Sequence, residues 1–495
     1  MPSTDRPRLA SRVAGQGALL FSGFALAQAL SFARNALLAH TLSKGDFGIA
    51  AAILLLLQTI ETLSDLGADR LIVQHRNGDD ARFVATAHTA LVLRGIATAL
   101  LIAAAAWPLA HFFGVPQAAW GFAAIALSPL IKSFVHLDSR RVQRRLDNRP
   151  QVLIEVVPQA LALALAWPAV ALTEGYAAVV ALALLQALVA VVVSHVYAER
   201  CYALAFDRRH LRRIVAFGWP IWASAFPLVA VYQGDRLLIG HLAGIEALAA
   251  YTVAFMVTMV PGLIAAKVGN ALMLPLLAGV RDDALRFNDR FLVMIEVTAI
   301  AAGAYLAAFV LLGGAIVEIA FGRNYAGLGG IVAWLALMWS MRMLQATLGV
   351  ALMAHGTTRP FLVAGLIRAL GLPLAFAALH MRLGLEGAAA AGAIAELMSL
   401  VYVGWRLQSF DATANGLRLG TAALLRTLPV VPAGLAALAL AQSPTVANSL
   451  SSEIVATGAV LVTLAVLALL VLPGLRASVA AWLSVPREQR LIRLE

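Results

Sequence analysis

Cysteine and charged residues are both scarce in this sequence. Cys201 is the single cysteine, so the chain can form neither an internal disulfide nor a cysteine-rich metal site. Only 13% of its 495 residues are charged, whereas 61% are hydrophobic, a balance far outside that of soluble globular domains. The sequence also lacks the common metalloprotease, nucleotide-binding and serine-hydrolase motifs. These absences argue against a soluble enzyme.

Long apolar segments recur along the whole chain. Each has roughly 20 to 28 residues, enough for a helix to cross a hydrocarbon core of about 30 Å. Together with a mean hydropathy of +0.85, they predict an all-α integral membrane protein with about fourteen transmembrane helices. The predicted spans are residues 15–41, 47–73, 84–111, 118–137, 151–172, 176–198, 214–240, 247–275, 291–312, 326–353, 360–380, 387–407, 419–441 and 453–473.

Lysine and arginine are concentrated in alternate loops. If Met1 is cytoplasmic, the loops on the opposite side contain only Lys44, Arg323 and Arg382, and this bias places both termini in the cytoplasm. The basic runs RRVQRRLDNR (140–149) and DRRHLRR (207–213) are therefore interpreted as topology signals. Lipid headgroups are a lesser alternative for them, and nucleic acid is not expected as a partner. The first span is too long for a signal peptide and is expected to be retained.

The second half of the sequence weakly repeats the first. NALLAHTLSKGDFGIAAA (35–52) aligns with DRLLIGHLAGIEALAAYT (235–252), and later matches keep nearly the same offset. Each half contains six predicted spans, so both halves enter the membrane in the same direction. This predicts two pseudo-symmetric six-helix bundles around a central cleft, plus an accessory C-terminal helix pair. The predicted parts are an N-terminal bundle (1–213), a second bundle (214–410), the helix pair (411–473) and a cytoplasmic interfacial tail (474–495).

Charged side chains inside the spans are the candidate functional residues. A charge at the centre of a membrane helix costs on the order of 2.5 to 3.5 kcal/mol, so these groups must face one another or water. The basic candidates for binding an anionic substrate are Arg34, Arg94, Arg236, Lys267, Arg342 and Arg368. The acidic candidates, either for ion coupling or as counter-ions, are Glu61, Asp65, Asp235 and Glu396. Glu61 and Asp65 are one helical turn apart, so they should project together.

Structural roles are alternatives for several charged residues. Buried ion pairing is as good an interpretation as substrate binding for Arg342, Arg368 and Glu396. Three residues near span ends are expected to reach the membrane interface instead: Lys132, Glu155 and Glu296. The final hairpin is expected to carry no charge in mid-span.

Two further features bear on the mechanism and on enzyme function. Pro220 and Pro227 predict a kink in the span 214–240, which is either a moving part or a static bend. Every predicted loop is short, whereas a membrane-bound glycosyltransferase or polymerase would need larger outer loops with catalytic groups. We therefore expect a protein that is not an enzyme.

Three stretches of the sequence resemble the bacterial oligosaccharide flippases of the polysaccharide transporter family. They are TLSKGDFG (41–48), SDLGADRLIVQ (64–74) and DRLLIGHLAGIEALAAYTVAF (235–255). The superfamily also contains multidrug exporters and the lipid II flippase, and the resemblance covers essentially the whole chain. It implies a protein of the bacterial inner membrane that moves an undecaprenyl-diphosphate-linked sugar repeat to the periplasmic leaflet. The product would serve exopolysaccharide, O-antigen or capsule assembly.

The resemblance also implies how such a protein works. Guanidinium and ammonium groups in a cationic cleft suit a diphosphate, and alternating access would carry it across. No cofactor is expected, and the energy would come from a proton or sodium gradient. The expected partners are the lipid bilayer, a glycan polymerase and a chain-length regulator. The alternatives are a lipid II flippase, a multidrug antiporter of the same superfamily or, from another class, a membrane-bound polysaccharide polymerase or ligase.

Overall fold

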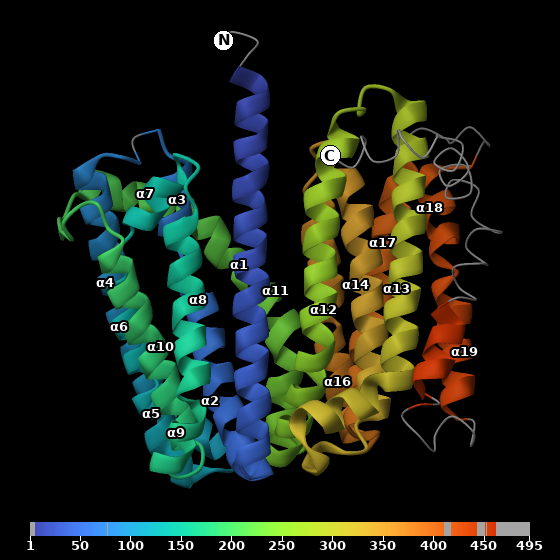
Figure 1. The fold of residues 1–495 in the computed structure, drawn as a ribbon, viewed down its shortest axis with the longest axis horizontal. Helices are drawn as coiled ribbons and strands as arrows, with labels where there is room; N and C mark the ends of the chain where they lie inside the picture. Colours follow the sequence, from blue (N-terminus) through green and yellow to red (C-terminus); the bar gives the residue numbers. More distant parts are fainter. Residues whose placement is uncertain (1–4, 77, 410–416, 443–450, 452, 462–495) are drawn as a thin grey trace. The chain divides into compact units, whose positions relative to one another are not determined.

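The computed structural model describes residues 5–76, 78–409, 417–442, 451 and 453–461 (Figure 1). Within these ranges, the side chains of residues 5–14 and 265–272 are outside the description. The described chain consists of α-helices, short 3₁₀ turns and loops, with no β-strand. It divides into two compact units, Met1–Thr252 (unit 1) and Val253–Glu495 (unit 2). The all-α prediction is confirmed.

The helices are long and apolar enough for a membrane. Among the described residues, 11 helices could cross a bilayer, or 12 if one bent pair is counted as a single span. The chain is therefore a multi-pass membrane protein. The total of fourteen spans stays a prediction, because the last predicted span, 453–473, extends beyond the described residues. The predicted interfacial tail, 474–495, lies wholly outside them.

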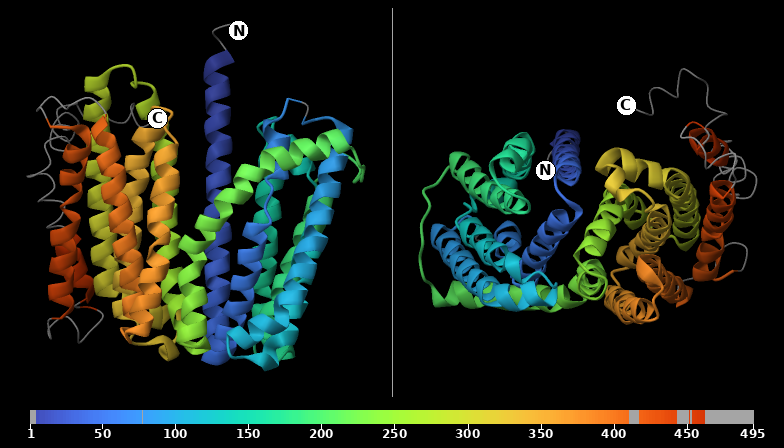
Figure 2. Two further views of the ribbon diagram at one scale, coloured as in Figure 1. Left: turned by 180° about the vertical axis from the view of Figure 1, so that it is seen from behind. Right: turned by 90° about the horizontal axis from the view of Figure 1, so that it is seen from below.

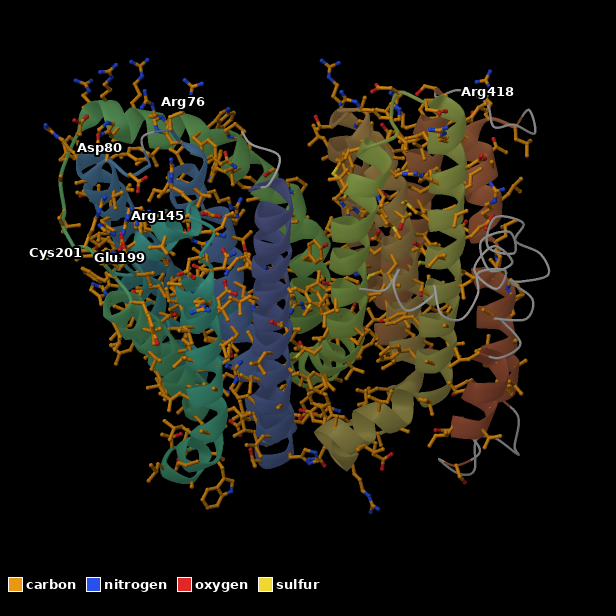
Figure 3. All side chains as sticks on the ribbon, turned by 45° about the horizontal axis from the view of Figure 1, so that its top comes forward. Arg76, Asp80, Arg145, Glu199, Cys201 and Arg418 are labelled. Carbon is orange, nitrogen blue, oxygen red and sulfur yellow. The ribbon has the colours of Figure 1, made fainter. Side chains whose placement is uncertain are left out.

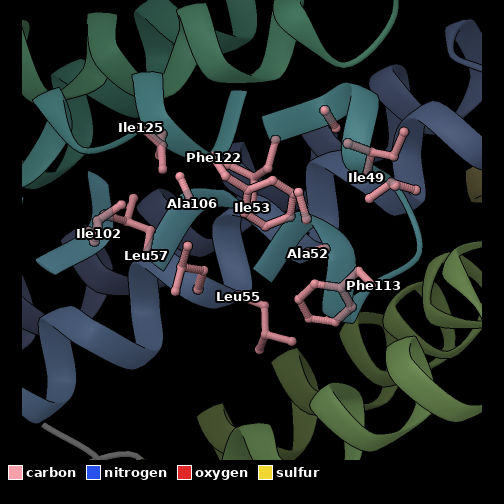
Figure 4. Packing of buried hydrophobic residues seen from close by; sticks show 14 of the residues in the cluster. Ile49, Ala52, Ile53, Leu55, Leu57, Ile102, Ala106, Phe113, Phe122 and Ile125 are labelled. Carbon is pink, nitrogen blue, oxygen red and sulfur yellow. The ribbon is translucent and has the colours of Figure 1, made fainter. Parts of the chain in front are cut away.

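Unit 1 is a bundle of helices around an apolar core. Its α-helices are α1 (Asp5–Thr41), α2 (Lys44–Leu63), α3 (Ala68–Gln74), α4 (Ala81–Phe112), α5 (Ala119–Ala124), α6 (Leu127–Lys132), α7 (Asp138–Gln143), α8 (Arg149–Ala164), α9 (Ala166–Leu172), α10 (Ala177–Val196) and α11 (Arg208–Leu242). The main core joins α2, α4 and α5, and Ile53, Ile102 and Phe122 are fully buried there (Figure 4). α1 packs on α8, and α8 packs on α10.

α11 belongs to unit 1 by its packing, running obliquely across the bundle in contact with α2, α3 and α4 (Figure 2). It continues through Pro220 and Pro227 as one helix. The sequence pattern assigns the same helix to the second bundle (214–410). That predicted domain boundary stays a prediction.

Unit 2 is built around α13 and α14. Its α-helices are α12 (Ile245–Ala278, which starts in unit 1), α13 (Ala284–Phe321), α14 (Gly329–Ala354), α15 (Arg359–Ala369), α16 (Gly371–His380), α17 (Gly384–Arg406), α18 (Leu419–Thr427) and α19 (Val430–Ala441). α14 packs between α13 and α17, and α18 and α19 of the final hairpin pack on α13. A second core joins α13 to α19 through residues such as Ala307, Leu311 and Ala433.

Proline accounts for three breaks within predicted spans. α8 and α9 meet at a bend of 48°, and Pro168 lies just after that break. Pro373 and Pro432 stand in the same position after the breaks between α15 and α16 and between α18 and α19. Proline lacks the N–H that would bond the carbonyl four residues earlier, and its ring clashes with that carbonyl. The apolar pattern continues through these positions, so the breaks leave no mark in hydropathy.

The stretches that carry the family resemblance form helix boundaries. In TLSKGDFG, Ser43 is the N-cap of α2 and its Oγ accepts a hydrogen bond from the backbone N–H of Asp46 at 3.0 Å. In SDLG, the Asp65 carboxylate accepts the backbone N–H of Gly67 at 2.9 Å, and Gly67 is left-handed with φ 59°. Glycine adopts that conformation without steric cost. The predicted span 47–73 is therefore divided into α2 and α3.

Candidate functional site

Two adjoining cavities in unit 1 are lined by charged side chains. The smaller has a volume of about 200 Å³ and the larger about 520 Å³, and they share Glu61, Leu91 and Arg94. The smaller cavity is lined by Glu61, Leu91, Arg94, Gly95, Thr98, Pro129, Lys132 and Ser133. The larger is lined by Glu61, Thr62, Asp65, Asp69, Arg70, Leu91, Arg94, Ile221, Ser224, Ala225 and Leu228. Both therefore combine polar groups with apolar walls.

Lys132 and Glu61 form an ion pair in the smaller cavity. Lys132 ends α6, and its Nζ lies 3.1 Å from Glu61 Oε1 on α2. Their side chains remain 42% and 26% exposed, respectively. Lys132 therefore has a carboxylate partner within unit 1, and the expectation that it reaches the membrane interface stays a prediction.

Arg94 connects the two cavities and holds the end of α2. From α4, its Nη1 lies 3.5 Å from Asp65 Oδ1. Its Nε donates to Ser64 Oγ at 3.2 Å, and its Nη2 donates to the Glu61 carbonyl at 3.1 Å. A cation at the carboxyl end of a helix also complements the helix dipole. Arg94 thus has a structural role besides lining the cavities.

The turn after α2 extends the charged set toward one end of unit 1. Asp65 also binds Arg70 Nη2 at 3.1 Å, and Asp69 binds Arg140 of α7 at 3.1 Å. Acidic and basic groups therefore alternate from Lys132 to Arg140. The sequence predicts Glu61, Asp65 and Arg94 as candidates but misses Lys132, Asp69, Arg70 and Arg140. Only the close spacing of charges in SDLGADR could have indicated Asp69 and Arg70.

The close approach of α4 to α6 shapes the smaller cavity. A Cβ atom on Gly95 would lie 2.3 Å from Ser133 Cβ and 2.9 Å from the Pro129 carbonyl oxygen. Only glycine fits at this contact without displacing α6. Lys132, the neighbour of Ser133 in the chain, is thereby held within reach of Glu61.

Arg34 is buried elsewhere in unit 1, among α1, α8 and α10. Only 9% of the residue is exposed. Its Nη1 donates to Gln159 Oε1 at 3.0 Å, and that oxygen also accepts a hydrogen bond from Gln186 at 2.7 Å. No carboxylate of the described residues lies within ion-pair distance of Arg34. Its neighbours are neutral amides and Ser31, so its charge is uncompensated.

Asp235 and Arg236 lie in the last two turns of α11. The Tyr251 hydroxyl donates to Asp235 Oδ2 at 2.7 Å, and Arg236 Nη2 donates to the Tyr232 carbonyl at 2.7 Å. Neither residue lines the two cavities described above.

In unit 2, the basic candidates have different surroundings. Arg342 of α14 and Glu396 of α17 form a buried ion pair at 2.5 Å, and the guanidinium lies over the Trp339 ring. The structure therefore supports the pairing alternative for these two residues. Arg368 of α15 has a buried Nε without a hydrogen-bond partner among the described residues. Lys267 lies in α12, and its side chain is outside the described residues.

A second ion pair, with a fully buried carboxylate, holds the final hairpin to α13. Arg426 Nε of α18 lies 2.5 Å from Glu296 Oε1 of α13, and the Glu296 side chain is 0% exposed. Two expectations are therefore wrong: Glu296 does not reach the membrane interface, and the final hairpin does carry a charge. Arg426 lies eight residues into its span, where sequence alone does not indicate a partner on α13.

Glu155 is exposed and accepts a hydrogen bond from Gln151 at 2.6 Å.

One end of unit 1 carries a dense polar network. This basic end contains α3, α7 and the start of α11, and Figure 3 labels Arg76 and Arg145 on this side of unit 1. Arg141 is its centre, with only 2% of its side chain exposed and ion pairs to Asp138 and Glu199. The hydrogen bond to Asp138 raises the pKa of Arg141 above its ordinary value. Burial raises the pKa of Asp138, but hydrogen bonds from Arg141 and Glu199 outweigh it and lower the pKa overall.

The sequence matches a known family over most of this architecture. The family is described as "Polysaccharide biosynthesis protein", and its model matches residues 37–328. The chain belongs to this polysaccharide biosynthesis family. The match covers nearly all of unit 1, including both cavities and the SDLGADR turn. It confirms the resemblance that the sequence motifs indicate.

A curated bacterial protein is similar to this chain over more than half of its length. Teichuronic acid biosynthesis protein TuaB of Bacillus subtilis (strain 168) is 23% identical over 296 residues. The alignment covers 59% of this chain and 61% of TuaB, so the chain spans less than two thirds of that relative.

Two solved structures have a fold similar to that of this chain. A structure of the lipid II flippase MurJ in an inward closed conformation has a TM-score of 0.74 at 12% identity, covering 91% of this chain and 98% of MurJ. An inward-facing multidrug resistance MATE family transporter of the MOP superfamily has a TM-score of 0.60 at 15% identity, covering 83% and 95%. These two structures are described as a flippase and a multidrug transporter.

Proposed function

We propose that this protein moves an undecaprenyl-diphosphate-linked oligosaccharide repeat across the bacterial inner membrane by alternating access. The repeat would pass from the cytoplasmic to the periplasmic leaflet for assembly of a surface polysaccharide. The observation that carries the proposal is the set of cations among the membrane helices of unit 1: Arg34, Arg94 and Lys132. A diphosphate leaves water only where guanidinium or ammonium groups replace its hydration. Membership of a polysaccharide biosynthesis family supports a glycan as the cargo.

The cavity ion pairs suit reversible binding of an anion. Glu61, Asp65, Arg94 and Lys132 are all between 26% and 42% exposed, and ion pairs at such exposure contribute little stability. A diphosphate can therefore replace the carboxylates as the partner of Lys132 and Arg94. Glu61, once displaced, would bind a proton or a sodium ion. In this scheme the ion gradient resets the site, and no cofactor takes part.

The remaining basic candidates are assigned by their surroundings. Arg34 is the strongest additional phosphate ligand, because no described carboxylate neutralises it. Arg236, Lys267 and Arg368 are kept as proposed substrate contacts. Arg342 and Glu396 are proposed to act as a structural pair within unit 2, with Asp235 bound to Tyr251. We further propose that the basic end of unit 1 faces the cytoplasm, as the positive-inside bias indicates, and that a polymerase and a chain-length regulator act as partners.

A multidrug antiporter is the second candidate function. The larger cavity contains Glu61, Asp65 and Asp69, which could attract a cationic ligand, and the fold is shared with a multidrug transporter. Each of these carboxylates already binds a cation, however: Lys132, Arg94 or Arg140. This pairing leaves no excess negative charge, so the glycan lipid is favoured.

Deletion of the gene tests the proposed function. The surface glycan should disappear while lipid-linked repeats accumulate on the cytoplasmic side. Wild-type protein should restore the glycan, whereas Arg34→Ala and Lys267→Ala should fail at equal protein levels. Arg286→Gln, which alters an exposed arginine paired with Asp283, is the matched control and should restore it. Normal glycan in the deletion strain, or full restoration by both test variants, would contradict the assignment.

A further inference from the structure

The first turns of α11 expose a cluster of arginines that the proposed transport cavity does not use. Leu211, Ile214 and Phe217 point inward and pack on the apolar cluster of α3 and α4. The opposite face exposes Arg208 and Arg212 at helical spacing. We call Arg76, Arg208, Arg209, Arg212 and Arg213 the basic rim. Arg76 belongs to it because the neighbouring His75 contacts Arg213 at 3.0 Å.

The basic rim differs from other arginines at the same end of unit 1. Arg82, Arg140 and Arg141 each have a carboxylate partner. Within the described residues, no carboxylate lies within ion-pair distance of any rim arginine. Asp207, the nearest acid in the chain, is occupied as the N-cap of α11 and as the partner of Arg82. The basic rim therefore presents positive charge that this end of the chain does not neutralise.

Local energetics disfavour this concentration of charge. Arg208 and Arg212, and likewise Arg209 and Arg213, are like charges four residues apart on a helix, which repel. Arg208 and Arg209 also lie in the first turn, where the helix dipole disfavours cations. The pKa of His75 is lowered by burial and then by the charges of Arg213 and Arg144, which is consistent with a positive local potential. A bound anion would relieve both costs.

Apolar side chains are exposed beside the basic rim. Phe206 is 66% exposed in the loop before α11, and Val215 and Trp219 are 49% and 60% exposed on the same face as Arg212. Trp219 lies roughly 10 Å along the helix axis from Arg212 at 1.5 Å per residue. Arginine at the level of phosphate groups and tryptophan just below them is the arrangement found at a membrane interface.

We propose that the basic rim is a binding surface for the headgroups of anionic phospholipids. The arginines would contact the phosphate groups, while Phe206, Val215 and Trp219 enter the adjoining acyl region. This site is distinct from the cavity between α2, α4 and α6 and goes beyond the proposed transport function. It would hold the start of α11, whose later residues Ile221 and Leu228 line the larger cavity, against the membrane surface.

Cys201 provides the means to test the proposal. It is the single cysteine, it is exposed, and it lies in the loop that leads to α11. Full-length protein in a neutral detergent would carry an environment-sensitive fluorophore on Cys201 and be titrated with short-chain phosphatidylglycerol. Short-chain phosphatidylcholine and inorganic phosphate serve as separate arms. The fluorescence change should saturate with phosphatidylglycerol and stay small in both other arms.

Variants of the rim decide whether the arginines cause the binding. Arg208→Gln/Arg212→Gln should raise the half-saturating phosphatidylglycerol concentration about thirtyfold, and Arg208→Lys/Arg212→Lys should stay within about threefold of wild type. The matched control Arg281→Gln/Arg286→Gln removes the same charge from arginines that are paired with aspartates and should have little effect. Unchanged titration of the rim variant, an equal loss in the control, or equal saturation by inorganic phosphate would overturn the proposal. Matching thermal unfolding midpoints exclude misfolding.

Discussion

At the scale of single residues, Lys132 and Glu61 form the ion pair of the smaller cavity. Their contact is partly exposed, so it contributes little to stability, but in the proposed function it sets the charge that a substrate meets. Arg94 and Gly95, in contrast, also maintain the structure: one holds the end of α2 and the other allows α4 to approach α6. Substitutions of Arg94 or Gly95 are therefore expected to disturb the structure, whereas a substitution of Lys132 is not.

We predict that Lys132→Ala lowers glycan-lipid transport at least tenfold, because it removes a proposed phosphate ligand. Thermal stability should change little, since the pair with Glu61 is partly exposed. Lys132→Arg should retain most activity. The measurement is transport of a fluorescent glycan lipid in proteoliposomes, with Arg286→Gln as the control. Wild-type transport by Lys132→Ala would remove this residue from the site.

At the scale of elements, the start of α11 depends on its N-cap. The Asp207 carboxylate accepts the backbone N–H groups of His210 and Arg209. The hydrogen bond from His210 is the main cause that lowers the pKa of Asp207. Because the folded-state pKa is depressed, the cap contributes at every pH above the ordinary carboxyl range and is lost as the pH falls through the lowered value.

We predict that Asp207→Ala speeds amide exchange in the first turn of α11 about fivefold at neutral pH. The difference between variant and wild type should vanish only under acid conditions, below the ordinary pKa of aspartate. Hydrogen–deuterium exchange read by mass spectrometry measures both effects, and Asp207→Asn should be intermediate. A difference that disappears already near pH 6 would contradict the lowered pKa.

The final hairpin is attached to α13 by an ion pair whose carboxylate is fully buried. Removing one partner of a buried ion pair costs about 3 to 5 kcal/mol, because the remaining charge loses that partner and stays out of water. We predict a loss of this size for Arg426→Met. Arg426→Met/Glu296→Leu should recover most of it, since an apolar pair of similar volume carries no desolvation cost. Thermal unfolding in detergent measures the two variants, and equal destabilisation by the single and double substitutions would count against the pair.

At the scale of the whole molecule, Cys201 reports the orientation in the membrane. It follows α10, whereas Glu174 precedes the same helix, so the two positions lie on opposite sides of the bilayer. We predict that a membrane-impermeant maleimide labels Cys201 in inside-out vesicles and not in intact spheroplasts. Cys201→Ser/Glu174→Cys should show the reverse. Labelling of Cys201 in intact spheroplasts would invert the proposed topology.

Hydropathy predicts most helices of the described chain because the length of an apolar run is a local property. The spans near 84–111, 176–198 and 326–353 correspond closely to α4, α10 and α14. The span 118–137 is instead broken into α5 and α6, and 47–73 ends at the SDLG turn. The second break follows from the left-handed Gly67, and the first precedes Pro129, the third residue of α6. An average of hydropathy over twenty residues is insensitive to both.

The sequence by itself determined that this is a helical membrane protein of the polysaccharide biosynthesis family, with charges that must avoid lipid. Only the tertiary structure decided which charges meet. Arg34 and Arg342 have the same signature, an arginine in an apolar helix, yet Arg342 meets Glu396 and Arg34 meets a glutamine. The partner of a charged side chain depends on which helices are neighbours and on how each is rotated, and both follow from packing across the whole unit.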